Sequence, residues 1–196
     1  WRGEETGIVG AWFSRQIWWA ALGAAVATAL AAVDYRFWIR TAWWLYLGSL
    51  GLLALVLVAG TKVYGAYRWL VILGVPVQPS EFAKVAMVLV LARVLGGGAI
   101  HPRAFASVEV PLLLMALPFG LILVEPDLGT AMVLGPTAVF MLFAAGGALR
   151  YLLGLGALGV AGVGLALSPL ARFALSDYQM ERIHTFLDPS RDPLGS

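Results

Sequence analysis

The sequence contains no cysteine and no asparagine, and it carries little charge of either sign. The lack of cysteine excludes disulfides, thiolate metal sites and a cysteine nucleophile. Charged residues make up 12% of the 196 residues, whereas a soluble domain carries about a quarter. The net charge is +2 and no run of Lys or Arg is present, so nothing indicates nucleic acid as a partner.

The sequence is instead rich in long apolar segments, and 61% of its residues are hydrophobic. A transmembrane helix needs about 20 mainly apolar residues. Six segments approach that length: 17–34, 42–60, 79–97, 109–124, 129–147 and 150–168. The pattern predicts an all-α fold, a polytopic bundle of transmembrane helices that forms a single domain over 1–196. Residues 169–196 follow the last apolar segment, and the family resemblance given below implies that they begin a large loop outside the cytoplasm.

Charge is distributed unequally between the two ends of these segments. Basic residues gather after the first, third and fifth segments: Arg36, Arg40, Arg93, Arg103 and Arg150. Most acids fall at the opposite ends: Glu81, Glu125, Asp127, Asp177, Glu181, Asp188 and Asp192. The positive-inside rule then predicts that the basic loops face the cytoplasm. Chemistry at the acidic face would proceed outside the cytoplasm without ATP, on a substrate that arrives activated.

The first charged motif is Q-P-S-E-F-A-K, residues 78–84. Pro79 suits a first helical turn, and Glu81 suits the helix N-terminus. Glu81 and Lys84 share one helix face because they are three residues apart. This pattern fits an ordinary intrahelical ion pair. It fits equally an outward cavity with one fixed charge of each sign, since charges at membrane depth usually mark a site or pathway.

The second motif is E-P-D-L-G-T-A, residues 125–131, which ends one segment and opens the next. Asp127 is expected to cap the following helix, its more ordinary role. The functional alternative is an acidic wall that faces Lys84 or Arg68.

The third motif lies in residues 175–196, where apolar and charged residues alternate. We expect a short helix on the membrane surface, followed by two Asp-Pro turns at Asp188 and Asp192. Turn initiation alone would explain both aspartates. His184 and His101 are expected on opposite sides of the membrane and so form no joint metal site.

Taken together, the three motifs resemble the SEDS family of cell-wall polymerases. The matching strings are Q-P-S-E-F-A-K at 78–84, E-P-D-L-G-T-A at 125–131 and F-L-D-P-x-x-D-P-L-G-S at 186–196. The D-Y-Q-x-x-R-I stretch at 177–183 is more similar to the rod-shape branch of the family than to its division branch. Tyr64 and Tyr67 depart from the family pattern.

The resemblance implies a bacterial protein of the cytoplasmic membrane with ten spans, of which these six would be the second to seventh. It implies a peptidoglycan glycosyltransferase that polymerises lipid II on the outer face, with inversion, during elongation and rod-shape maintenance. The implied partners are lipid II, membrane lipids and a class B penicillin-binding protein that cross-links the strands.

The resemblance also implies roles for individual residues. Such chemistry needs a base for the acceptor hydroxyl and cationic groups for the leaving pyrophosphate. Asp192 is the candidate base, and a divalent cation such as Mg²⁺ could assist departure. The candidate substrate-binding residues are Glu81 and Lys84 lining the cavity, Arg68 and Arg182 meeting phosphate, and Glu125 and Asp127 shaping the site.

Two other functions remain open from the sequence. A lipid II flippase would also use an outward charged cavity, but it should carry charge at the membrane midplane. A scaffold would only anchor and activate the penicillin-binding partner. Its interface could be the small residues of the last segment (Gly154, Gly156, Gly159, Gly162 and Gly164), although we expect these to pack inside the protein.

Overall fold

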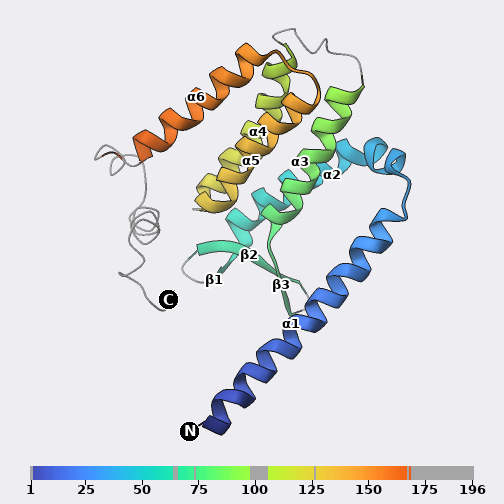
Figure 1. Cartoon of the computed structure of the whole chain (residues 1–196), viewed down its shortest axis with the longest axis vertical. Helices are drawn as coiled ribbons and strands as arrows, with labels where there is room; N and C mark the ends of the chain where they lie inside the picture. The colour runs from blue at the N-terminus through green and yellow to red at the C-terminus, as the bar shows by residue number, and fades with distance from the viewer. Residues whose placement is uncertain are drawn as a thin grey trace. The chain divides into compact units, whose positions relative to one another are not determined.

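The computed structural model describes residues 2–63, 66–72, 74–97, 106–125, 127–166 and 168. Its six helices are α1 (Arg2–Ala31), α2 (Tyr35–Ala59), α3 (Pro79–Gly96), α4 (Ala106–Val124), α5 (Leu128–Ala144) and α6 (Leu149–Ala166) (Figure 1). Each predicted apolar segment corresponds to one of them, so the prediction of six helices is confirmed. The first begins earlier than expected, because residues 2–16 are also helical.

The six helices differ in how well they suit a bilayer. Within the described residues, α2 is the one helix whose length and apolar composition together suffice to cross a membrane. Shorter apolar stretches follow in α4, α5 and α6, at Val108–Val124, Gly129–Ala144 and Leu149–Gly162. The membrane topology with six spans stays a prediction.

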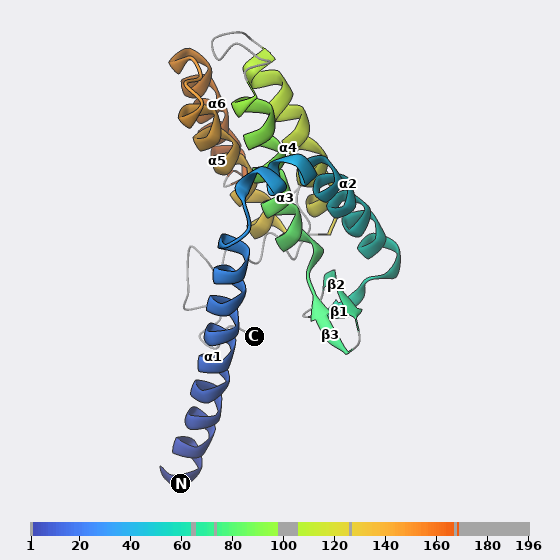
Figure 2. The ribbon, with the colours of Figure 1, turned by 90° about the vertical axis from the view of Figure 1, so that its right-hand side faces the viewer.

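The predicted all-α class is wrong for residues 61–77, the connection between the second and third apolar segments. This segment forms an antiparallel sheet of β1 (Thr61–Val63), β2 (Ala66–Ile72) and β3 (Val75–Val77), in the order β1-β2-β3. Gly74 has a positive φ of 81° between β2 and β3, a conformation that glycine adopts without steric cost. Valine, isoleucine and aromatic residues in short runs between such turns favour strands. Views in two directions place the sheet beyond the end of α2 and the start of α3 (Figure 2).

The chain divides into two compact units, Trp1–Arg40 and Thr41–Ser196. In the second unit, α3 packs against both α4 and α5. The buried core of this unit comes from α2, α3, α4 and α5: Leu53, Ala83, Met87, Leu91, Ile122, Ala131, Leu134 and Ala138. This core fixes the start of α3 beside the connection between α4 and α5, where the charged motifs lie.

A hydrogen bond from α2 replaces a backbone hydrogen bond that α4 lacks. Pro118 lies inside α4 and has no N–H, so the carbonyl of Leu114 lacks its usual helical donor. The hydroxyl of Tyr46 donates to this carbonyl oxygen over 2.6 Å. Tyr46 is 2% exposed, so water does not replace it. The contact joins α2 to α4.

The glycines of α6 do not pack inside the described part of the protein, contrary to expectation. A Cβ added at Gly154, Gly156, Gly159, Gly162 or Gly164 would meet no described atom within 4 Å. Among the described elements α6 packs on α5, at the far side of the turn in which Gly146 has a φ of 79°. These five glycines are therefore available for the partner interface that the scaffold hypothesis requires.

Removing the Tyr46 hydroxyl should destabilise the fold. We expect Tyr46→Phe to lower the free energy of unfolding by about 1–3 kcal/mol, because the Leu114 carbonyl would be buried without a donor. Thermal unfolding of the purified protein in detergent measures this. Tyr35→Phe is the control, since the Tyr35 side chain is exposed. Equal melting temperatures for Tyr46→Phe and Tyr35→Phe would contradict the prediction.

Candidate functional site

Three segments, one of them about 50 residues further along the chain than the other two, meet at the sheet end of the second unit. They are β2, the residues that precede α3, and the connection between α4 and α5. The end of α3 and the turn between α5 and α6 lie at the opposite end of the bundle (Figures 1 and 2). The sequence analysis placed the ends of the first, third and fifth apolar segments on one side, and this arrangement agrees with it for α3 and α5. The first two charged motifs lie together at the other end.

Asp127 is the centre of this junction. It is the N-cap of α5, and its Oδ1 accepts from the backbone N–H of Thr130 at 3.3 Å. Its Oδ2 accepts from the Thr130 hydroxyl at 2.8 Å and from Gln78 Nε2 at 2.9 Å. The predicted cap is therefore confirmed, and the same carboxylate also binds the residue that precedes α3.

The carboxylate of Asp127 also forms an ion pair with β2. Arg68 Nη1 lies 3.4 Å from Asp127 Oδ1, and the two side chains are only 9% and 5% exposed. The hypothesis that this motif faces Lys84 or Arg68 is resolved in favour of Arg68. A guanidinium so buried and already engaged with a carboxylate is better placed to hold β2 than to reach a phosphate.

Glu125 lies two residues before Asp127 and is 1% exposed. Neither carboxyl oxygen has a hydrogen-bond partner among the residues that the structure describes. Burial, together with the nearby charge of Asp127, raises the pKa of Glu125 to about 8, and Arg68 only partly offsets the rise. Glu125 is therefore mostly protonated at neutral pH.

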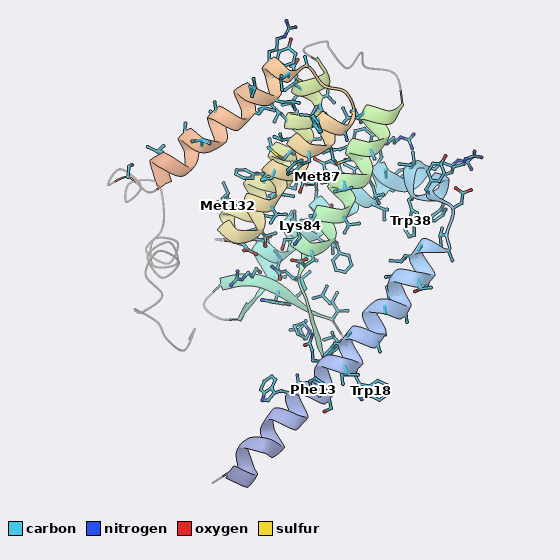
Figure 3. All side chains as sticks on the ribbon, in the orientation of Figure 1. Phe13, Trp18, Trp38, Lys84, Met87 and Met132 are labelled. Carbon is cyan, nitrogen blue, oxygen red and sulfur yellow. The ribbon has the colours of Figure 1, made fainter. Side chains whose placement is uncertain are left out.

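Glu81 and Lys84 form the intrahelical ion pair that their spacing predicts. Lys84 Nζ lies 2.9 Å from Glu81 Oε1, and the side chains are 28% and 55% exposed respectively. Lys84 lies nearer the sheet than Met87 does (Figure 3). Of the described candidate residues, these two are the ones that an external molecule can reach most easily.

Gln78 is a site residue that the sequence did not reveal. It bridges the start of α3 to Asp127, although its own side chain does not cap α3. A polar side chain between Val77 and Pro79, in apolar surroundings, is the feature that could have indicated it. Ser80, in the same turn, is fully buried, and its hydroxyl has no partner within the described ranges.

The remaining candidates lie outside the described residues. These are Arg182 and the proposed base Asp192, together with Asp188, His184 and the expected surface helix. In the described part of the chain, no group of three His, Asp or Glu side chains is close enough to hold a metal ion.

Comparison with known proteins identifies the family of the chain. A family model described as a cell cycle protein, which covers FtsW, RodA and SpoVE, matches residues 3–196. The chain belongs to this family. It thus belongs to the SEDS proteins that its motifs resemble.

Individual relatives agree with this assignment. The chain is 36% identical, over 95% of its length and 48% of the relative's, to a Trichlorobacter lovleyi protein named "Probable peptidoglycan glycosyltransferase FtsW". It is 38% identical to Thermus thermophilus rod shape determining protein RodA, with a TM-score of 0.61 over 72% of this chain and 47% of that one. A structure of a peptidoglycan synthase complex that coordinates polymerization and crosslinking matches at 38% identity and a TM-score of 0.67, over 92% of this chain and 52% of that one. The chain thus spans about half the length of the relatives it matches.

The two ion pairs of the site should differ sharply in their contribution to stability. We expect Asp127→Ala to lower the free energy of unfolding by about 3–5 kcal/mol, because it leaves a buried guanidinium without its carboxylate. Glu81→Ala should cost less than about 1 kcal/mol, because that pair is exposed to solvent. Chemical or thermal unfolding in detergent measures both, and similar losses in the two variants would contradict the burial argument.

Proposed function

We propose that the whole protein is a peptidoglycan glycosyltransferase that polymerises lipid II on the outer face of the cytoplasmic membrane. The observation that carries the proposal is the convergence of the Q-P-S-E-F-A-K and E-P-D-L-G-T-A motifs on one end of a helical bundle in a SEDS chain. The names of the relatives, which include a peptidoglycan glycosyltransferase and a rod-shape protein, support it. The similarity to RodA favours a role in elongation and rod-shape maintenance.

The proposed reaction assigns each residue a distinct role. Asp192 removes the proton of the acceptor hydroxyl, which attacks the anomeric carbon as the bond to the pyrophosphate breaks. Direct displacement inverts that carbon. Lys84, which is partly exposed, and Arg182 offer positive charge to the leaving pyrophosphate. Glu81 holds Lys84 in place at the start of α3 through their ion pair.

In this proposal Arg68 does not contact the substrate but positions the segments that do. Its ion pair with Asp127 and the bond from Gln78 to Asp127 tie β2, α3 and α5 together. Precise placement of this kind matters because catalytic groups lose much of their effect when displaced by about 1 Å. Arg68, Asp127 and Glu125 therefore shape the site, and Lys84 and Asp192 meet the reacting molecule.

The distribution of charge along the helices favours an enzyme over a flippase. In α2 to α6, every Asp, Glu, Lys and Arg of the described residues lies within the first or last turn of its helix, or one turn further in. Transporters usually carry polar or charged groups near the membrane midplane. The same membrane protein would work beside a class B penicillin-binding protein, a pairing suggested by the similarity to a complex that polymerises and crosslinks.

Substitution of the two Asp-Pro aspartates tests the proposal. We expect Asp192→Ala to lower lipid II polymerisation by the whole protein and its partner by at least about 100-fold, the contribution typical of a general base. Asp188→Ala is the matched control and should retain most activity. The measurement is the length and amount of glycan strand on a gel.

Folding and binding of the penicillin-binding partner must be intact in both variants for this comparison. Equal activity of the two variants would show that both aspartates are turn residues. Movement of lipid II between leaflets without polymerisation would instead support the flippase.

A further inference from the structure

The buried polar cluster at the sheet end contains more carboxyl groups than cationic groups. Arg68 is the described cation of this cluster, whereas Glu125 and Asp127 are both carboxylic acids, 1% and 4% exposed. Asp127 has the guanidinium, an amide and a hydroxyl as partners. Glu125 has no hydrogen-bond partner in the described part of the chain. Among the described side chains, Asp127 is thus paired with Arg68, whereas Glu125 has no such pair.

Within the ranges that the structure describes, no other charged group pairs with Glu125. The charges near the start of α3 are Glu81 and Lys84, which are partly exposed and pair with each other. The acid within α4 is Glu109, which lies in the first turn, at the end of the helix opposite to Glu125. Among the side chains that the structure describes, α5 adds only Asp127 at its N-cap, and β2 adds Arg68. A second negative charge at Glu125 would have to share Arg68 with Asp127.

We propose that Glu125 is the proton-carrying carboxyl of this cluster, and that its ionisation draws Arg68 away from Asp127 and loosens β2 from the start of α5. Glu125 is thus a pH-sensitive positioning residue. It does not touch substrate in this account. The proposal goes beyond the glycosyltransferase function and does not depend on it, because it concerns a proton and an ion pair that exist without substrate.

The direction of the pH effect follows from proton linkage. A glutamate in an unfolded chain has a pKa near 4.3, whereas burial raises the pKa of Glu125 to about 8 in the folded protein. Between these values the folded state binds more protons than the unfolded state. Its stability therefore falls as the pH rises, until the folded carboxyl has itself ionised.

Infrared difference spectroscopy of the whole protein in detergent tests the proposal directly. We expect the C=O band of a protonated carboxylic acid to be present near neutral pH and to disappear as the pH rises through about 8. Glu125→Gln should abolish this band. Glu109→Gln, in the first turn of α4, is the control and should leave the band unchanged.

Asp127→Asn tests the coupling to the ion pair, which burial alone would not produce. Without the charge of Asp127, Arg68 is available to Glu125, so the band should titrate at a lower pH than in the natural protein. Melting temperatures should agree: the decline with rising pH should be present in the natural protein and in Glu109→Gln, and lost in Glu125→Gln.

Three results would overturn the proposal. They are the absence of the band near neutral pH, its survival in Glu125→Gln, and an unchanged titration in Asp127→Asn. If Glu125→Gln fails to fold, Glu125→Asp takes its place, because it keeps an acid but moves it. The proposal then predicts a band with a shifted titration, and an unshifted band would count against it.

Discussion

The junction between the sheet and the helices depends on one buried ion pair. Arg68 from β2 and Asp127 at the start of α5 lie 3.4 Å apart, almost out of contact with solvent. Desolvation makes such a pair costly to form, so its net contribution to stability is small. Removing only one partner costs far more, because the other charge stays buried. Gln78 adds the start of α3 to the same carboxylate. The pair therefore specifies how three segments meet more than it strengthens the fold.

The helices could be predicted from the sequence because long apolar runs have few alternatives. Pro79 and the motif from Glu125 to Asp127 also marked where α3 and α5 begin. The sheet could not be predicted in the same way. Its strands are three to seven residues long, and an apolar run of that length fits a strand or a helix equally. The turn at Gly74 was the local feature that favoured strands.

The site could be predicted only in part. Spacing alone gave the pair of Glu81 and Lys84, because helix geometry brings residues three apart onto one face. The sequence offered Arg68 and Lys84 as alternative partners of Asp127 and could not decide between them, because β2 and α5 are far apart in the sequence and meet only in the tertiary structure. The raised pKa of Glu125 depends on its burial in the folded protein. Partners of this kind follow from tertiary structure, so composition and motif do not reveal them.

The central claim is that this end of the bundle polymerises an activated lipid-linked sugar outside the cytoplasm. Proteoliposomes with oriented whole protein and its penicillin-binding partner, supplied with lipid II in one leaflet at a time, test it most directly. The account predicts glycan strands only when lipid II lies in the leaflet on the side of the sheet. Strands made from the opposite leaflet, or lipid II that crosses the bilayer without being polymerised, would contradict it.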